Sequence, residues 1–345
     1  MAAYELVKLA APADPPTGAV RSVAYSPNGS YLASFCTVTP FIHVYSVNSS
    51  TGVLTKLTQP TLLPPSPLSA GSRAISFSPD GTQLALTYPN NSPYLHVYDV
   101  SGTSVSKRTL SIATPPPAGG VCLAYSPSGG HVVIGHQNTP FMSIYSISGS
   151  TYTKLANPSL LPASAVVDAT YSPDGALLAV LHSGATPYLT VYSVSGTTYT
   201  KLTNPATLPS AGATGLAFSP DGATLAITYS VAPYVMFYAV SGTTLTAFTV
   251  TAVGTINDGD RVRYSPDGTK LVVAHVSSPY FATWSVAGSA YVGQLDPPVP
   301  TGVVSGLAFS PDSQFLTVGC NTTPFLVTYR VGALDSAPTP AFLWG

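Results

Sequence analysis

Seven residues with polar or polarisable side chains recur at one fixed place in the sequence, nine residues after the proline of a Ser-Pro pair. They are Cys36, Tyr88, His136, His182, Tyr229, His275 and Cys320. Histidine and cysteine bind zinc, and His136 and His182 stand in adjacent repeats, but a closed zinc site needs three or four ligands. The column is interpreted either as a polar cap on the core or as a rim that binds a ligand or partner, and we expect no metal.

Charged residues form a second candidate cluster. Arg21, Arg73 and Asp260 lie six residues before the same prolines, Asp168 and Arg261 lie five residues before them, and Asp258 and Arg263 are close by. Only 7% of the chain is charged, against roughly 25% in ordinary domains, so this concentration is notable. The cluster predicts either compensating ion pairs, each worth little, or a site for an anionic or sugar-like ligand with Arg21 and Arg73 as hydrogen-bond donors.

Catalytic motifs are missing from the sequence. It has no Gly-x-Ser-x-Gly, no His-Glu-x-x-His and no glycine-rich phosphate loop. Glu5 is the only glutamate, and Asp80, Asp174, Asp221, Asp267 and Asp312 stand in predicted turns. We therefore expect a protein that is not an enzyme, with no catalytic residues and no cofactor.

An internal repeat positions these residues. An aromatic-Ser-Pro unit recurs at spacings of 45 to 52 residues, with its prolines at Pro27, Pro79, Pro127, Pro173, Pro220, Pro266 and Pro311. Most copies continue as Asp-Gly, which favours a tight turn because Asp caps the turn and Gly adopts positive φ. The last copy carries Ser313 instead of Gly.

A second landmark keeps step with the first, 13 or 14 residues later. It is a proline followed at once by an aromatic residue: Phe41, Tyr94, Phe141, Tyr188, Tyr234, Tyr280 and Phe325. Between landmarks lie short β-branched and aromatic runs separated by turn residues, without helical periodicity. Four such runs per repeat predict an all-β fold, a seven-bladed β-propeller with four-stranded blades. Its first strands, with the charged cluster, would line the central channel.

The chain ends predict how the ring closes. A Lys-Leu-x-x-Pro motif follows several fourth strands and also occurs at Lys8–Pro12, before any first blade, while the last blade lacks it. We therefore expect residues 4–9 to supply the outer strand of the last blade, which also hides a sheet edge. The predicted domains are a propeller at 1–332 and a C-terminal tail at 333–345.

The tail contains a third candidate. Phe342, Leu343 and Trp344 lie beyond the closing strand. They either pack on the protein's own outer edge or anchor a partner subunit, because aromatic residues dominate such contacts.

The composition excludes several classes of protein. The chain has 345 residues, a net charge of −1 and 12 scattered basic residues, which gives no footprint for nucleic acid. No apolar run approaches the roughly 20 residues that span a bilayer, so we expect no membrane insertion. No secretory signal is visible at the N-terminus. Three cysteines are too few for a disulfide scaffold, and free thiols are expected.

These repeats resemble WD-repeat-like propellers of the Ser-Pro-Asp-Gly kind, over almost the whole chain. The Gly-His element of true WD repeats is missing and Trp-Asp is replaced by Tyr-x, with only Tyr98-Asp99 close to it, which argues against a eukaryotic adaptor role. Stretches such as SPYLHVYDV and TPYLTVYSVSGTTYTKLTNPATLP are similar to repeats in bacteriophage-encoded propellers, often tail or other virion components. The resemblance implies location in the virion, after synthesis in the host cytoplasm.

Several functions follow from this reading. The favoured one is a non-enzymatic structural or interaction protein of a bacteriophage virion (tail, fibre or capsid surface) that contacts other virion proteins and a host-surface glycan or receptor. Alternatives are a glycan- or receptor-binding lectin with Tyr-rich loops, a hydrolase similar to seven-bladed lactonases that uses the channel charges, and a cytoplasmic scaffold.

Overall fold

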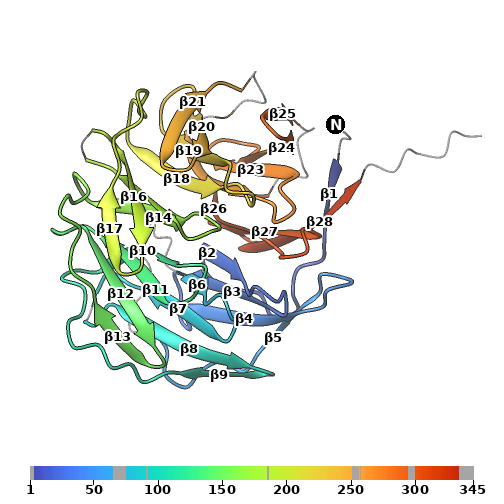
Figure 1. Ribbon diagram of the computed structural model, residues 1–345. Helices are drawn as coiled ribbons and strands as arrows, with labels where there is room; N and C mark the ends of the chain where they lie inside the picture. Colours follow the sequence, from blue (N-terminus) through green and yellow to red (C-terminus); the bar gives the residue numbers. More distant parts are fainter. Residues whose placement is uncertain are drawn as a thin grey trace, which may run out of the picture.

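The computed structural model describes residues 4–64, 75–90, 92–184, 186–250, 256, 258–293 and 300–333. The strands of these residues form seven four-stranded antiparallel sheets arranged around a central axis (Figure 1). The predicted all-β seven-bladed propeller is therefore confirmed.

The blades follow the sequence repeats. Blade 1 comprises β2 (Val20–Tyr25), β3 (Tyr31–Cys36), β4 (Ile42–Val47) and β5 (Leu54–Lys56). Blade 2 comprises β6 (Ile75–Phe77), β7 (Gln83–Thr87), β8 (Leu95–Ser101) and β9 (Ser104–Lys107). Blade 3 comprises β10 (Gly120–Tyr125), β11 (His131–His136), β12 (Met142–Ser148) and β13 (Thr151–Lys154). Blade 4 comprises β14 (Val166–Tyr171), β15 (Leu177–His182), β16 (Leu189–Ser195) and β17 (Thr198–Lys201).

The second half of the ring continues the pattern. Blade 5 comprises β18 (Ala213–Phe218), β19 (Thr224–Tyr229), β20 (Val235–Ser241) and β21 (Thr244–Phe248). Blade 6 comprises β22 (Gly259–Tyr264), β23 (Lys270–His275), β24 (Phe281–Ala287) and β25 (Ala290–Gly293). Blade 7 comprises β26 (Val304–Phe309), β27 (Phe315–Cys320), β28 (Leu326–Ala333) and, from the other end of the chain, β1 (Tyr4–Lys8).

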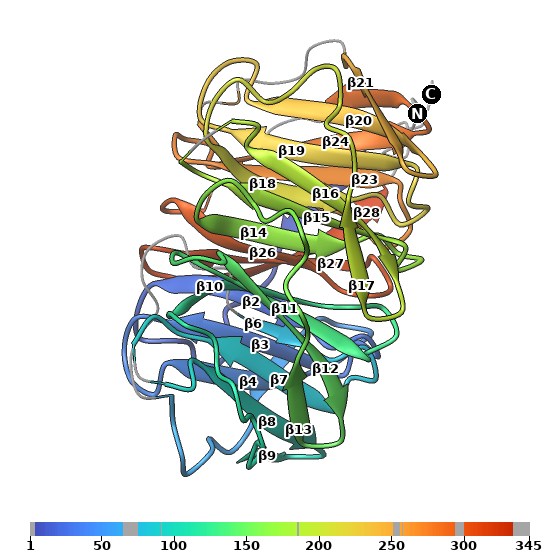
Figure 2. The ribbon, with the colours of Figure 1, turned by 60° about the vertical axis from the view of Figure 1, so that its left-hand side comes forward.

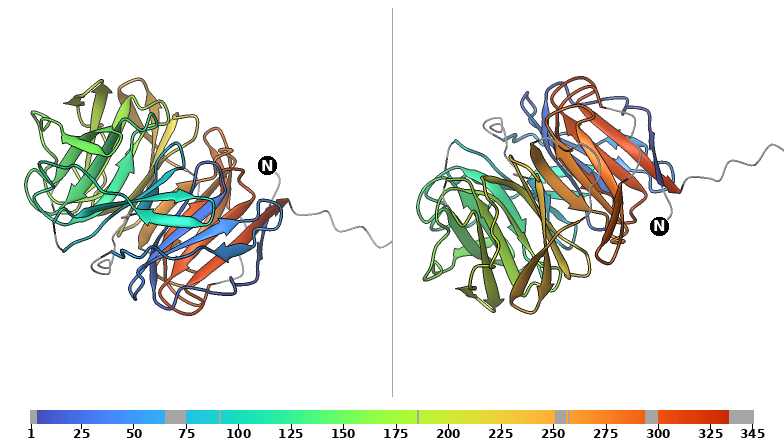
Figure 3. Two further views of the ribbon diagram at one scale, coloured as in Figure 1. Left: turned by 90° about the horizontal axis from the view of Figure 1, so that it is seen from below. Right: turned by 90° about the horizontal axis from the view of Figure 1, so that it is seen from above.

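The ring closes as the sequence predicts. Strand β1 pairs antiparallel with β28, and Leu6 stands opposite Val331. Leu6 is 4% exposed and packs into the core of blade 7. The inner strands β2 and β26 are also in contact, so the first and last blades lie side by side in both views of Figure 3.

The core lies between the blades. Its apolar clusters each combine residues of neighbouring sheets, as in the cluster of Leu181, Leu189 and Leu216 at blades 4 and 5. Second strands are covered on both faces, and β15 is buried over its whole length. The stacked sheets can be followed in Figure 2. Within the described part of the chain, no helix has the length and apolarity needed to cross a membrane.

Antiparallel order gives the ring two distinct faces. Turns between first and second strands lie on one face, here called the turn face. Connections between second and third strands, and the linkers between blades, lie on the opposite face, here called the loop face. In the turn of blade 4, Ser172 Oγ accepts from Leu177 N at 2.9 Å and donates to Asp174, and Gly175 has φ 73°.

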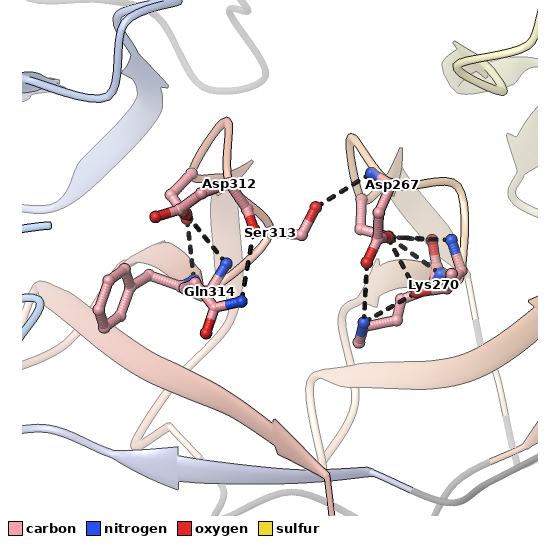
Figure 4. A network of polar contacts seen from close by, with 9 residues as sticks. Asp267, Lys270, Asp312, Ser313 and Gln314 are labelled. Atoms are coloured by element: carbon pink, nitrogen blue, oxygen red, sulfur yellow. Dashed lines mark hydrogen bonds and ion pairs between the residues drawn. The ribbon is translucent and has the colours of Figure 1, made fainter. Parts of the chain in front are cut away.

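The turns of the turn face also contact one another. A Cβ on Gly175 would meet the ring of Pro127 in the preceding blade. In blade 7 the corresponding residue is Ser313, which adopts φ 61°. Its Oγ accepts a hydrogen bond from the Asp267 backbone N–H of blade 6 at 3.0 Å (Figure 4). Ser313, the one residue that replaces the turn glycine of the repeat, therefore links two blades.

Candidate interaction site

The seven column residues lie in the protein core. Each is at most 1% exposed and stands at the end of a second strand or next to it. Their backbone N–H groups donate to the carbonyl of the aromatic residue that follows the loop proline, at 2.7–3.3 Å in all seven blades. Burial favours the interpretation as a polar cap on the core, and partner binding by this column stays a prediction.

Polar partners in the third strand satisfy several column side chains. His136 Nδ1 lies 2.7 Å from the Asn138 carbonyl, so it donates, and Nε2 lies 3.1 Å from Ser143 Oγ. His182 Nε2 lies 3.2 Å from Thr190 Oγ1. Burial lowers the pKa of His136, because desolvation disfavours the charged imidazolium. His136 therefore acts as a neutral hydrogen-bonding group.

Blades 1 and 2 each place a third-strand histidine beside the column residue. His43 Nδ1 lies 3.7 Å from Cys36 Sγ, and the rings of His96 and Tyr88 meet edge-on at 4.8 Å. Burial lowers the pKa of both His43 and His96 to about 4. Lys107 Nζ donates to His96 Nε2 at 3.0 Å, which requires that ring to be neutral.

The cysteines are free, as the sequence predicts. Cys36, Cys122 and Cys320 are buried and form no disulfide. Burial raises the pKa of Cys320 to about 12, so its thiol stays protonated and weakly reactive. Among the described residues, no group of three or more His, Cys, Asp or Glu side chains is placed to hold a metal ion.

A β-bulge explains where the charged cluster stands. In six blades the register between the first two strands shifts at the start of the first strand. Arg21 and Asp260 are the extra residues of two such bulges. Bulges re-aim side chains at barrel rims and sites. Arg73, the third member of that column, lies outside the described residues.

The channel charges are bonded to the backbone of neighbouring blades. Asp168 is 5% exposed, and its carboxylate accepts from Ala169 N at 3.1 Å and from Leu216 N of blade 5 at 3.3 Å. From blade 6, Arg263 Nη1 donates to the Leu216 carbonyl at 3.2 Å. One peptide segment of blade 5 is therefore held from both sides.

Arg261 extends this clamp towards the ring closure. It is 3% exposed, donates from Nη2 to the Arg21 carbonyl at 3.0 Å, and lies 3.8 Å from the Asp260 carboxylate. A cavity of about 250 Å³ beside the inner strands is lined by Asp168, Arg263 and the Leu216 segment. The structure thus joins Asp168 to Arg263 through the Leu216 segment and places Arg261 beside Asp260, and a channel ligand stays a prediction.

The tail residues Phe342 and Trp344 lie outside the described residues. Their role as an anchor stays a prediction.

A ring of aromatic side chains on the loop face was a landmark in the sequence rather than a predicted site. Each follows a cis proline and is half-buried: Phe41, Tyr94, Phe141, Tyr188, Tyr234, Tyr280 and Phe325. Phe41 and Tyr188 pack against the inter-blade cores beneath them. This set is called the loop-face aromatics below.

The backbone of the loop-face aromatics adopts an energetically unfavourable conformation. Six of the loop-face aromatics have φ between 59° and 69°, a region that costs non-glycine residues about 1–3 kcal/mol. The carbonyl of each member accepts the column N–H described above, and Tyr280 N donates to Ser277 O at 2.6 Å. The recurrence of proline and aromatic in all seven repeats is the sequence signal that could have identified this surface.

Comparisons with known proteins agree with the fold. The model of the WD domain, G-beta repeat, matches residues 12–37. A chain in the crystal structure of the mitotic checkpoint complex is similar, with a TM-score of 0.65 and 17% identity, covering 94% of this chain and 95% of that one. A search of curated proteins gave no match. These findings support a WD40-like seven-bladed propeller, and neither supports the expected similarity to bacteriophage propellers.

Proposed function

We propose that this protein is a non-catalytic interaction scaffold that binds a protein partner through the loop face. The observation that carries the proposal is the set of loop-face aromatics, which are seven half-buried side chains at equivalent positions. Aromatic residues are enriched in binding hot spots, and they lose little conformational entropy on contact.

Two further observations support a scaffold. The WD domain match and the likeness to a chain of a multiprotein checkpoint assembly are consistent with protein partners. The buried channel charges are engaged in hydrogen bonds between blades, which gives them a structural role and argues for a protein without catalysis.

The test removes the aromatic side chains but keeps the backbone. Asparagine tolerates positive φ better than other non-glycine residues, so Tyr188→Asn with Tyr234→Asn preserves the loops of blades 4 and 5. The matched control is Asp174→Asn with Asp221→Asn on the turn face of the same blades, because the chain itself uses Asn28 at this turn position.

The tagged chains are tested for binding to the particles or complexes that retain the wild-type protein, by sedimentation. We expect the loop-face pair to lower affinity roughly tenfold or more when it is measured well below the melting temperature of both variants, and the turn-face pair to bind normally. If the loop-face pair binds like the wild type, the proposed surface is wrong.

A narrower proposal concerns the assembly itself. We infer from the amino-acid sequence of the repeats and from the low content of charged residues that the assembly is a bacteriophage virion, with other virion proteins as partners. Mass spectrometry of density-gradient fractions tests this location. Near-stoichiometric recovery with intact particles is the expected result; recovery with soluble proteins removes the virion assignment and leaves the scaffold proposal standing.

Glycan binding is a second candidate, favoured by the four tyrosines among the loop-face aromatics. Tyrosine rings can stack on sugar faces while their hydroxyl groups hydrogen-bond. A glycan array with the wild type and the Tyr188→Asn, Tyr234→Asn pair distinguishes the candidates. Hits that disappear in the pair favour a lectin-like adhesion role over a protein partner.

A further inference from the structure

Blade 3 has an additional β-contact on its outer edge, which shows how a segment can add to a blade. Ser111, in the linker before the blade, forms a parallel bridge with β13. The Tyr152 N–H donates to the Ser111 carbonyl at 2.8 Å, and the Ser111 N–H donates to the Ser150 carbonyl at 2.9 Å. Leu110 and Ile112, on either side of Ser111, pack against the core between blades 2 and 3. A short linker segment therefore extends the sheet of blade 3.

The same place in blade 5 holds a cavity. In both blades the third-strand tyrosine donates to a linker carbonyl, and counting from that carbonyl makes Asn204 the counterpart of Ser111. Leu245 of β21 is the counterpart of Tyr152, because each stands two residues before the position opposite that tyrosine. Between the linker and β21 lies a cavity of about 380 Å³, lined by Asn204, Leu245 and Ala247 among others. The linker thus stands away from β21, the outer edge of its sheet (Figure 1).

The backbone of β21 offers a hydrogen-bond donor at this cavity. Val240, the residue opposite Leu245, donates its own N–H to the Ala223 carbonyl on the inner side of the blade. Residues opposite each other in an antiparallel pair bond in both directions or in neither, so the Leu245 N–H points out of the sheet. Within the described residues no acceptor for this N–H is present, whereas the equivalent N–H of blade 3 is bonded to Ser111.

Two departures from the other blades keep the linker and the strand apart. The linker of blade 5 has Thr203 and Pro205 in place of the two apolar residues that anchor the linker of blade 3. In addition, Ala247 stands opposite the third-strand tyrosine, where five blades have a lysine. In blade 1 that lysine, Lys56, reaches Asp14 of the preceding linker, with 2.9 Å between Nζ and the carboxylate. Alanine is too short to span this gap.

We propose that the cavity is the docking site for an extended segment of a partner protein, which adds to β21 as a parallel strand. The segment forms the two hydrogen bonds that Ser111 forms in blade 3, here with the Leu245 N–H and the Thr243 carbonyl. Unpaired edge strands are templates for such additions, and β21 has no lysine to blunt its edge. The inference goes beyond the loop-face proposal and does not depend on it, because none of the loop-face aromatics lines the cavity.

The size and the polarity of the cavity define the segment. A strand residue in a packed sheet occupies about 160 Å³, given its rise, the strand spacing and the sheet spacing, so the cavity has room for about two residues. The described lining residues are all uncharged, and a charge buried among them would have no compensating partner. The segment is therefore uncharged, with apolar side chains beside a small paired residue, as Leu110 and Ile112 lie beside Ser111.

The first experiment uses a peptide probe. A synthetic peptide with the sequence of residues 109–114, blocked at both ends, is titrated into the full chain, and we expect saturable binding. Ala247→Lys fills the cavity with the residue that five blades have at this place, and it should abolish binding. The matched control is Thr153→Lys, which adds the same charge at an exposed position on the outer strand of blade 3, and it should bind the peptide like the wild type.

Amide hydrogen exchange, measured by NMR, locates the peptide. In the free chain the Leu245 N–H should be protected at least roughly tenfold less than the Tyr152 N–H, because only the latter has a partner. The peptide should raise the protection of Leu245. The Thr203→Leu, Pro205→Ile pair gives the linker of blade 5 the apolar residues of blade 3. This pair should close the linker on β21, protect Leu245 without peptide and abolish peptide binding.

Three results would overturn the proposal. The first is that the peptide does not bind, or that it binds Ala247→Lys as tightly as the wild type. The second is that Leu245 in the free chain is as protected as Tyr152 at every protein concentration, because the linker then closes the cavity itself. The third is that this protection rises with protein concentration, because the occupant is then a second copy. Each of these results leaves the loop-face proposal standing.

Discussion

Blades 1 to 4 and the junction of blades 5 and 6 share one strand plan but are closed by different side chains. The third-strand position that faces the column is polar in the first four blades, where it holds His43, His96, Ser143 and Thr190. Blades 5 and 6 have Met236 and Ala282 there. On the outer side of their junction, Ala247 stands where five blades carry a lysine opposite the third-strand tyrosine, and Trp284 replaces that tyrosine in blade 6. An apolar groove of about 710 Å³ there is lined by Met236, Phe248 and Trp284.

The difference is confined to the outer part of the ring. Near the channel, the same junction is held by Arg263, which donates to the Leu216 carbonyl, and by Thr214, whose hydroxyl donates to the Gly259 carbonyl. The backbone register therefore survives although the outer closures are lost. The outer closure of one junction can therefore change while neighbouring blades and the inner strands maintain the fold.

The largest expected effect is acid destabilisation that originates in blades 1 and 2. The pKa values of His43 and His96 are about 4 in the fold and about 6.5 in an unfolded chain. The unfolded state binds more protons between these values, so stability is complete above pH 6.5 and falls towards pH 4. Each histidine should remove roughly 3 kcal/mol of the free energy of unfolding by pH 4.

Urea denaturation at pH 7.5 and pH 4.5 measures this loss. The control is the His43→Gln, His96→Gln double variant, which should be less stable at pH 7.5 but show a much flatter pH dependence. An equal slope in both proteins would mean that other groups dominate. The turn aspartates act at lower pH, because hydrogen bonds lower the pKa of Asp267 to about 2.

The next effect tests the inner clamp. Asp168→Ala removes the carboxylate that accepts from the Leu216 N–H, and hydrogen bonds to charged groups contribute about 1.5–3 kcal/mol. We expect a loss of about 2 kcal/mol in the free energy of unfolding, measured in urea. Asp168→Asn keeps an acceptor oxygen and should cost less. If the two variants are equally stable, the clamp does not depend on this acceptor.

Much of the fold follows from the sequence. The two proline landmarks recur in every blade, so blade number, strand order and the closing role of residues 4–9 are all predictable from spacing. The structure adds the register, in which Leu6 stands opposite Val331. Periodic signals of this kind survive because every repeat needs the same turns and buried strands.

The candidate site is less predictable. Period-2 alternation places His136 and His275 at the strand end but does not tell a rim from a core, and both are fully buried because the loop residues fold over them. The contacts of Asp168 with Leu216 and of Arg261 with Arg21 join different blades. Such contacts depend on the curvature of the ring, which linear spacing does not encode.

A smaller effect tests the tyrosine closures. Tyr192→Phe deletes the hydroxyl that donates to the Leu160 carbonyl at 2.9 Å, and a neutral hydrogen bond is worth about 1 kcal/mol. Tyr238→Phe in blade 5 should cost the same, because its bond to Thr207 has the same length. Thermal melting of both is compared with that of Tyr234→Phe, where Tyr234 is one of the half-buried loop-face aromatics. A loss in Tyr234→Phe as large as in the other two would contradict the comparison.

The smallest effect concerns Ser313, where the repeat is broken on the turn face. Ser313→Gly relieves a left-handed conformation that costs serine about 1 kcal/mol, but it deletes the acceptor of the Asp267 N–H, also worth about 1 kcal/mol. We therefore expect a net change within about 0.5 kcal/mol. Ser313→Ala keeps the strain and loses the hydrogen bond, so it should be the least stable of the three proteins in urea. If Ser313→Ala equals the wild type, the link between blades 6 and 7 at this turn contributes nothing, and the departure from glycine has no structural gain.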